Sequence, residues 1–189
     1  MPRQIALLRG INVGPNNRIA MPALRAALAE AGFGNVRTYV QSGNVVLDAE
    51  LEEGELAEAV TALIADRFEL AVPVVVRSAA ELAEVVAENP FPDAAVTAPK
   101  RLQVTFLSSR PADEVAERVR GVASGVFSLD TESISVAISC RNVYGWHPQG
   151  IHVSKLAREL SDRRLGVTAT ARNWTTVTTL LEMATADAG

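Results

Sequence analysis

The sequence predicts an α+β protein made of two ferredoxin-like βαββαβ units, with extra helices and mainly antiparallel sheets. Three observations indicate this fold. Short β-branched and apolar runs alternate with stretches of helical periodicity, the same order of elements occurs twice, and a proline-rich stretch lies between the two occurrences. We predict an N-terminal unit over residues 1–90, a linker over 91–100, and a C-terminal unit over 101–189 with an extra strand and a C-terminal helix.

The elements of the first unit follow from apolar runs and from the residues that end them. Pro22 lies in the first turn of a helix, where its missing N–H is tolerated. Ser78 and Glu81 form a capping box that begins another helix. In chain order we predict a strand at 4–9, a loop at 10–17, a helix from 21, strands at 36–40 and 45–47, a helix with an apolar face from 56 to 68, a strand at 73–77 and a helix from 78.

The second unit repeats this order after the proline-rich stretch at 89–100. Asn173 is placed to cap the last helix, and Ser154 is placed to cap the helix before it. The repeat is inferred from element order, because the two halves share no obvious sequence identity. In chain order we predict a strand at 102–107, a helix from 111, strands near 126–129, at 133–138 and at 142–146, a helix from 154, an extended piece at 167–170 and a helix from about 174.

The composition excludes several classes of protein. The chain has 189 residues, of which 48% are hydrophobic, so it can bury a core and is not a disordered tail. No apolar run approaches the length of about 18 residues that a membrane-spanning helix needs. We see no signal peptide either, and we therefore expect a cytoplasmic protein without a membrane partner. The single cysteine, Cys140, excludes a disulfide within the chain and a multi-cysteine metal cluster.

Charge is distributed unevenly along the chain. The net charge is −4, yet residues 48–88 hold eleven acids and two bases, while both ends are weakly basic. The acidic stretch falls on predicted helices and is typical of a solvated helix face. No segment has the strongly basic stripe of a dedicated nucleic-acid-binding protein. Nucleic acid is therefore a less favoured partner, although it stays open.

Three polar stretches next to strands are candidates for ligand binding. The first, at 9–14, is a glycine loop that can direct backbone N–H groups at an anion. It matches neither phosphate-binding glycine motif and has no P-loop lysine, so the alternative is a loop that needs positive φ angles. The second, at 38–46, supplies amide and hydroxyl groups but is also ordinary hairpin chemistry. An exposed Tyr39 on such a sheet would resemble the base-stacking residues of RNA-recognition domains. The sequence motif of those domains is missing from this chain.

The third polar stretch, at 170–177, contains an arginine at the start of the last helix. Arg172 could join the helix dipole in binding an anion, or it could pair with one of the many acids. Both histidines lie in another polar stretch at 147–156, but no third ligand stands at a spacing suited to a metal, so no metal site is predicted. His147 and Cys140 lack any local motif of a catalytic nucleophile.

These motifs resemble those of a bacterial family, the domain of unknown function 1697 family. The resemblance implies a two-part α+β fold of paired ferredoxin-like units, and it implies no activity. Pro15 departs from the family's pattern, because members of the family often continue the loop with a second glycine at this position. The matching segments are LLRGINVG at 7–14, residues 21–28, TYVQSGNVV at 38–46, NPF at 89–91, VTFL at 104–107, GIHVSKL at 150–156 and TARNWTTV at 170–177.

We expect a small polar or anionic ligand, including nucleotide-like ones, to bind between the two halves. One alternative is an enzyme that uses the same cleft, with Lys155 or a histidine in acid–base work. A second alternative is RNA binding through a ferredoxin-like sheet. A third is that the polar motifs serve only as loops and helix caps. The sequence assigns no cofactor and no oligomeric state. The ligand-binding residues that we predict are Arg9, Asn12, Gln41, Ser42, Asn44, Lys155, Arg172 and Asn173.

Overall fold

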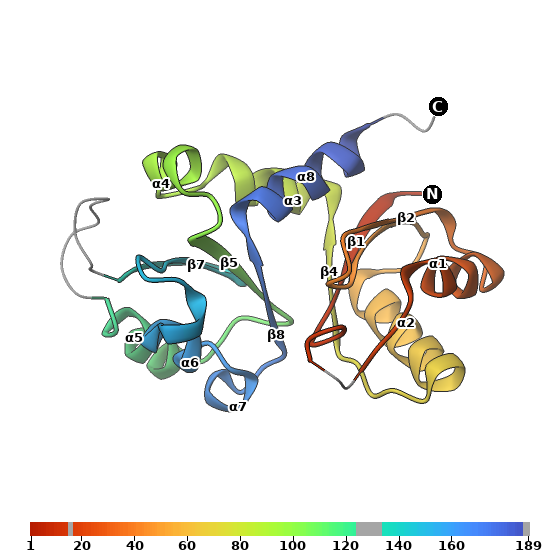
Figure 1. Cartoon of the computed structure of the whole chain (residues 1–189), viewed down its shortest axis with the longest axis horizontal. Coiled ribbons are helices and arrows are strands. Elements are labelled where there is room, and N and C mark those ends of the chain that lie inside the picture. The colour runs from red at the N-terminus through yellow and green to blue at the C-terminus, as the bar shows by residue number, and fades with distance from the viewer. Residues whose placement is uncertain (15–16, 124–133, 187–189) are drawn as a thin grey trace. The chain divides into compact units, whose positions relative to one another are not determined.

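The computed structural model describes residues 1–14, 17–123 and 134–186 (Figure 1). The chain divides into two compact units. Unit 1 comprises Met1–Glu84 and Thr179–Gly189, and unit 2 comprises Val85–Thr178. Each unit contains a four-stranded antiparallel sheet with the βαββαβ order of elements and extra helices, so the predicted fold class is confirmed. The departure at residue 15 and the strand predicted near 126–129 lie outside the described residues.

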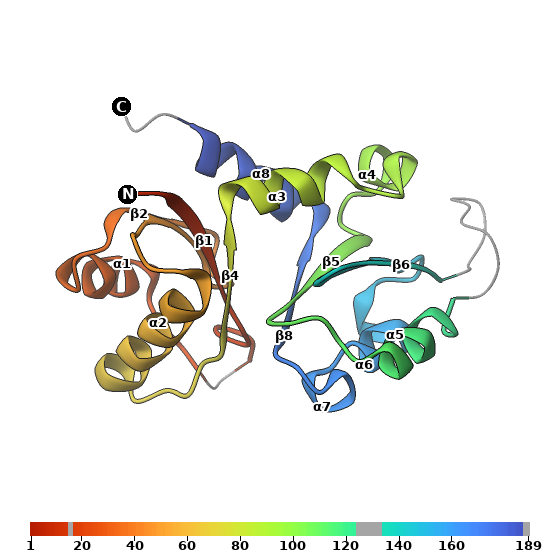
Figure 2. The ribbon, with the colours of Figure 1, turned by 180° about the vertical axis from the view of Figure 1, so that it is seen from behind.

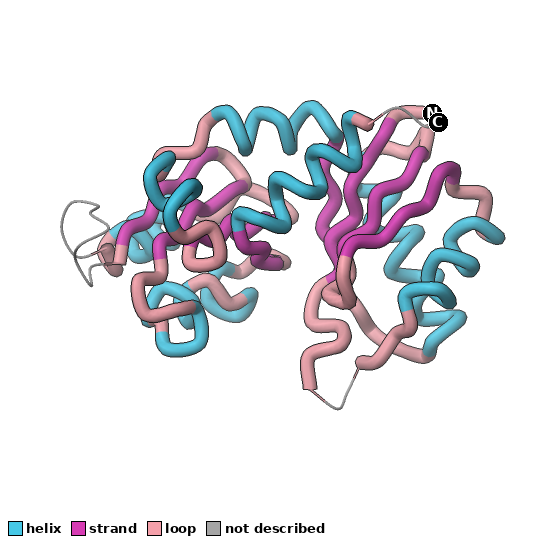
Figure 3. The backbone as a smooth tube through the Cα atoms, turned by 45° about the horizontal axis from the view of Figure 1, so that its top comes forward, coloured by secondary structure: helices cyan, strands magenta, loops and turns pink. Residues whose placement is uncertain are grey.

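The sheet of unit 1 has the strand order β2-β3-β1-β4. Its strands are β1 (Arg3–Leu8), β2 (Gly34–Tyr39), β3 (Asn44–Asp48) and β4 (Val74–Ser78), which run side by side in Figure 3. β1 pairs antiparallel with both β3 and β4. This central position explains why β1 is apolar almost throughout, since a strand with neighbours on both edges and cover on both faces has little contact with water.

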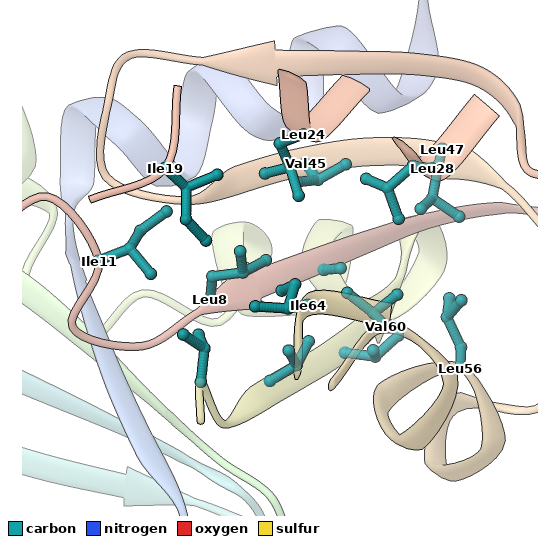
Figure 4. Packing of buried hydrophobic residues seen from close by; sticks show 14 of the residues in the cluster. Leu8, Ile11, Ile19, Leu24, Leu28, Val45, Leu47, Leu56, Val60 and Ile64 are labelled. Atoms are coloured by element: carbon teal, nitrogen blue, oxygen red, sulfur yellow. The ribbon is translucent and has the colours of Figure 1, made fainter. Parts of the chain in front are cut away.

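Helices α1 (Met21–Glu30) and α2 (Glu53–Phe68) pack on the same face of this sheet, and their buried residues share one core with it. In α2 the buried side chains recur at every fourth position, which puts them on one face of the helix. Figure 4 shows the helix residues pointing towards the strands. Its labelled residues include Leu8 and Val45 from the strands, Leu24 and Leu28 from α1, and Leu56, Val60 and Ile64 from α2.

The predicted capping box at the start of α3 (Ala79–Ala87) is confirmed. The Ser78 hydroxyl accepts the backbone N–H of Glu81 at 3.1 Å, and the Glu81 carboxylate accepts the backbone N–H of Ser78 at 3.0 Å. Part of the predicted linker is helical, because Pro92 begins the short helix α4 (Pro92–Thr97). Proline suits the first turn of a helix as well as it suits a linker.

The sheet of unit 2 has the strand order β6-β7-β5-β8. One face carries α5 (Asp113–Arg120) and α6 (Lys155–Glu159), which lie beside each other in Figure 2. A one-turn helix at Ile151–Val153 precedes α6, and α7 (Asp162–Leu165) follows it. The strands are β5 (Leu102–Leu107), β6 (Ser135–Ser139), β7 (Asn142–Trp146) and β8 (Ala169–Asn173).

The last helix, α8 (Trp174–Thr185), begins where the sequence predicts it. The side-chain oxygen of Asn173 accepts the backbone N–H of Thr176 at 2.9 Å, which confirms the predicted cap. This bond satisfies one of the helix N–H groups that lack a partner in the first turn.

The repeat extends from element order to individual residues. Arg77 in β4 pairs with the third residue of β1, and Arg172 in β8 pairs with the third residue of β5. Each arginine donates a hydrogen bond to the carbonyl of the residue before it, at 2.7 Å from Arg77 and 2.8 Å from Arg172. The next residue, Ser78 or Asn173, caps the helix that follows. The two units therefore use equivalent residues at equivalent positions, although little of the sequence is identical.

Candidate functional site

A pocket of about 260 Å³ in unit 2 brings together much of the polar stretch after β7. Its polar and glycine lining comes from a short segment of chain, while apolar side chains complete the wall. The lining residues are Val122, Ile134, His147, Pro148, Gln149, Gly150, Val153, Ser154 and Lys155.

The pocket forms where the chain turns from strand β7 into helix α6. The backbone N–H of His147 donates to the carbonyl of Arg101 at 3.0 Å, which continues the β5–β7 pairing by one residue. The chain then folds back, and the N–H of Gly150 donates to the carbonyl of His147 at 2.9 Å. Gly150 has a φ of +91°, a backbone conformation that glycine adopts without strain. The turn brings Ser154, at the start of α6, back beside His147.

His147 and Ser154 are hydrogen-bonded to each other inside this turn. The Nδ1 atom of His147 lies 2.7 Å from the Oγ atom of Ser154, and the two residues are only 1% and 6% exposed. Burial lowers the pKa of His147 to about 4, so its ring is uncharged at neutral pH. Ser154 occupies the N-cap position of α6 as predicted, but its side chain makes no capping hydrogen bond. The predicted position of the cap is therefore confirmed, but the predicted capping hydrogen bond is wrong, because the Ser154 hydroxyl is hydrogen-bonded to the imidazole of His147.

Gly145 leaves room for the imidazole on the surface of β7. A Cβ atom at this position would lie 3.0 Å from Nε2 of His147 and 2.9 Å from Cδ2 of Leu156. Both distances are tighter than ordinary van der Waals contact, so a larger residue would displace the ring or the helix. No local sequence pattern marks Gly145, because its close approach to the His147 ring two residues along the chain depends on the path of the turn that follows.

Lys155 stands where this pocket adjoins a second, more polar hollow. That hollow of about 430 Å³ shares Val122 and Lys155 with the pocket and is further lined by Gly121, Arg158, Glu159 and Arg164. Among the described residues, the side chains of Lys155 and Arg158 have no hydrogen-bond or ion-pair partner. Both are exposed on α6, Lys155 at its first position and Arg158 in its last turn. They are therefore available to a negatively charged group.

Glu159 is the carboxylate in the lining of this hollow, and it forms ion pairs with two arginines. Its carboxyl oxygens accept hydrogen bonds from Arg118 at 3.2 Å and from Arg164 at 2.5 Å. Burial by itself raises the pKa of Glu159, but the hydrogen bonds and charges of the two arginines outweigh burial and lower it. Lys155, Arg158 and Arg164 line the same hollow as Glu159, so its lining carries more positive than negative charge.

In unit 1, Asn12 holds the glycine loop against the neighbouring hairpin. Its Nδ2 atom donates to the carbonyls of Gln41 at 2.7 Å and Ile19 at 2.9 Å, while its Oδ1 atom accepts the N–H of Ile19 at 3.0 Å. Its φ of +55° is one that asparagine tolerates better than most residues. These contacts favour the alternative in which the loop residues satisfy the chain's own geometry.

The hairpin turn of unit 1 is held in the same way. The buried Asn44 donates from Nδ2 to the carbonyl of Tyr39 at 3.1 Å and to the hydroxyl of Ser42 at 3.4 Å. Gln41 and Ser42 are exposed beside it, and Arg9 at the end of β1 is half-buried. The structure therefore brings the predicted residues of unit 1 close together, with the two asparagine amides engaged in holding the loop and the turn.

Arg172 lies on the other face of the unit 2 sheet from Lys155. Ala169 belongs to the core beneath α5 and α6, and alternate residues of β8 point to opposite faces, so Arg172 points away from these helices. Its guanidinium donates to the Thr170 hydroxyl at 2.7 Å and to the carbonyl of Ala171 at 2.8 Å. Burial lowers the pKa of Arg172 to about 10, and the side chain remains charged at neutral pH.

The predicted site residues thus belong to separate groups. Their convergence on one ligand between the two halves stays a prediction. The residues of unit 1 are Arg9, Asn12, Gln41, Ser42 and Asn44, and those of unit 2 are Lys155, Arg172 and Asn173.

Neither clustered metal-ligating side chains nor a long apolar helix occurs in the described part of the chain. No three side chains of the metal-ligating types gather there into a group that could hold a metal ion. None of the helices in the same residues combines the length and the apolar character needed to cross a bilayer.

Comparison with known proteins identifies the family. A family described as "Protein of unknown function (DUF1697)" matches residues 1–136, well over half of the chain. Among solved structures, the conserved bacterial protein SP0830 from Streptococcus pneumoniae has a TM-score of 0.74 at 18% sequence identity, over 97% of this chain and 98% of that chain. At that identity the likeness concerns the fold alone. No curated protein matches the chain. The chain belongs to the DUF1697 family of proteins of unknown function.

Proposed function

We propose that this protein binds a small anionic ligand in the unit 2 pocket, with Lys155 holding the negative charge. The observation that carries the proposal is the position of Lys155 in the lining of the pocket, without a partner among the described residues. A carboxylate or phosphate is the group that such an ammonium recognises. This is the ligand class that the sequence predicts, with its binding site in unit 2 and not between the two halves.

The surface beside Lys155 supports an anion rather than a neutral ligand. Arg158 lies in the adjoining hollow, where Glu159 is already bound by Arg118 and Arg164. An incoming anion would therefore meet cations whose charges are not balanced by the neighbouring carboxylate. Because these side chains are exposed, water screens each contribution, and an exposed ion pair stabilises a complex by only about 0.2–1 kcal/mol. A contact to a group partly enclosed by the pocket is stronger, at about 1.5–3 kcal/mol.

The interior of the pocket favours the uncharged part of such a ligand. Four of its lining residues, Val122, Ile134, Pro148 and Val153, are apolar. The burial that lowers the pKa of His147 keeps its ring neutral at pH 7, so it can offer hydrogen bonding but no charge. A volume of about 260 Å³ is just below the range of about 300–1,000 Å³ typical of ligand sites. The ligand is therefore small, with its anionic group at Lys155.

RNA binding through a sheet has less support. A sheet that stacks bases exposes aromatic and basic side chains. In unit 1 the residues of β1 and β3 are buried almost without exception, and those on the face away from α1 and α2, such as Ile5, Leu7 and Val46, are apolar.

The two lysines of the chain provide a matched test. Lys100 is exposed, lies in unit 2 and does not line the pocket, so Lys100→Met is the control for Lys155→Met. Thermal shift and calorimetry with inorganic phosphate, adenosine monophosphate and succinate measure binding to both variants and to the wild type. We expect at least one of these anions to bind the wild type and Lys100→Met about 10-fold or more tightly than Lys155→Met. Equal affinity for all three proteins, or no binding to the wild type at millimolar concentration, would contradict the proposal.

A further inference from the structure

The unit 2 pocket also contains the two components of a nucleophilic site. The Oγ atom of Ser154 and the Nδ1 atom of His147 are 2.7 Å apart, and both residues line the pocket. In the tautomer that carries its proton on Nε2, the Nδ1 atom accepts the hydrogen bond of the hydroxyl. This arrangement activates a serine, because the ring can take up the proton as the oxygen attacks. The distance lies within the range of about 2.6–3.2 Å that proton transfer requires.

We propose that Ser154 is a catalytic nucleophile that attacks the carbonyl carbon of a small ester, with His147 as its general base. The substrate class extends the proposed function, because Lys155, next in the chain, would hold a carboxylate on the acyl group of the ester. The nucleophile itself depends only on the Ser154–His147 pair. The two ideas can therefore fail separately.

The surroundings of His147 suit a base. Burial lowers its pKa to about 4, which keeps the ring in the proton-accepting form at neutral pH, although it also makes the ring a weaker base. The absence of a side chain at Gly145 leaves space for the ring, since a Cβ atom there would lie 3.0 Å from Nε2 of His147. The turn closed by the bond from Gly150 to His147 sets the ring opposite the serine. The pair is therefore positioned by backbone geometry and not by two flexible side chains.

The reaction balances with water as the second substrate. Oγ of Ser154 bonds to the carbonyl carbon while its proton passes to Nδ1 of His147. The carbon–oxygen bond to the alcohol breaks, and the imidazolium gives its proton to that leaving oxygen. A water molecule then attacks the acyl-serine, His147 accepts a proton from the water and returns it to Oγ, and the acid is released. One ester and one water give one acid and one alcohol.

A purely structural role of the Ser154–His147 hydrogen bond predicts a different reactivity for Ser154. If the hydrogen bond only satisfies two buried polar groups, Ser154 will have the low reactivity of any other serine. Ser161 is the matched control, because it also occupies an N-cap position without capping its helix, and its hydroxyl donates to the carbonyl of Arg158 instead of an imidazole.

The test is covalent labelling of the full-length protein with an uncharged fluorophosphonate, followed by peptide mass spectrometry. We expect the label on Ser154 in the wild type and in Ser161→Ala, and about 100-fold slower labelling in His147→Gln. Because mapping of the wild type locates the label directly, the result does not depend on whether Ser154→Ala folds. A wild-type protein without label on Ser154, or labelled equally on Ser154 and Ser161, overturns the nucleophile.

Ester hydrolysis separates this proposal from the anion site. Release of 4-nitrophenol is measured from the mono-4-nitrophenyl ester of succinic acid and from 4-nitrophenyl acetate, which lacks the charge. We expect a preference for the succinate ester that Lys155→Met removes and Lys100→Met retains. Labelling of Ser154 without this preference supports the nucleophile and overturns the role of Lys155. Lys155-dependent binding of anions without labelling or turnover overturns the nucleophile and leaves the proposed function intact.

Discussion

Acid should destabilise unit 2 because His147 is buried in its neutral form. The pKa of this residue is lowered from 6.5 to about 4 by burial. Between these values the unfolded chain binds a proton that the native state does not bind, so the free energy of unfolding falls as the pH falls. For a single group with these pKa values, the loss is about 2 kcal/mol between pH 7 and pH 5 and reaches about 3 kcal/mol below pH 4.

Urea denaturation at pH 7 and pH 5, followed by tryptophan fluorescence, measures this effect. Both tryptophans of the chain, Trp146 and Trp174, belong to unit 2, and Trp146 directly precedes His147. The comparison protein is His147→Gln, which has no group that titrates at this position. The wild type should lose about 2 kcal/mol more than the variant on acidification. The reasoning is refuted if the two proteins show the same dependence on pH.

Two further substitutions test the packing of the units. Gly43→Ala should destabilise the protein by about 2 kcal/mol or more in urea denaturation, because the backbone there has a φ of +73° and a Cβ atom would lie 2.6 Å from Cβ of Leu8; an unchanged midpoint would contradict the geometry. Tyr144→Phe should cost about 1–2 kcal/mol in the same assay, because it removes a buried hydrogen bond of 2.9 Å to the carbonyl of Val85. Burial and the nearby charge of Glu88 raise the pKa of Tyr144 to about 12, so its ultraviolet absorbance should show no ionisation at pH 10.

Local signals in the sequence predicted most of the fold. Apolar periodicity indicated the strands and helices, and the caps at Ser78 and Asn173 were confirmed because capping depends on residues only three positions apart. The helix at Pro92–Thr97 was missed, since its prolines indicated a linker as strongly as a helix start. The equivalence of Arg77 and Arg172 was also missed, because it appears only once the strands are aligned by their hydrogen bonds.

The candidate site was less predictable than the fold. Asn12 and Asn44 were recognised as polar loop residues, but whether an amide faces a ligand or its own backbone depends on the path of the loop. The contact between His147 and Ser154 joins residues seven positions apart through a turn, and no periodicity signals such a contact. Lys155 was predicted as a residue of the polar stretch at 147–156, yet its place in the lining of a pocket depends on that same turn.

The role of Lys155 is most directly tested by observing its amine. Reductive methylation with ¹³C-formaldehyde labels both lysines of the chain, and nuclear magnetic resonance then follows each dimethyl-lysine signal. Titration with the tightest-binding anion among phosphate, adenosine monophosphate and succinate should shift the Lys155 signal in a saturable way and leave the Lys100 signal in place. Movement of both signals alike, or of the Lys100 signal alone, would contradict an anion site at Lys155.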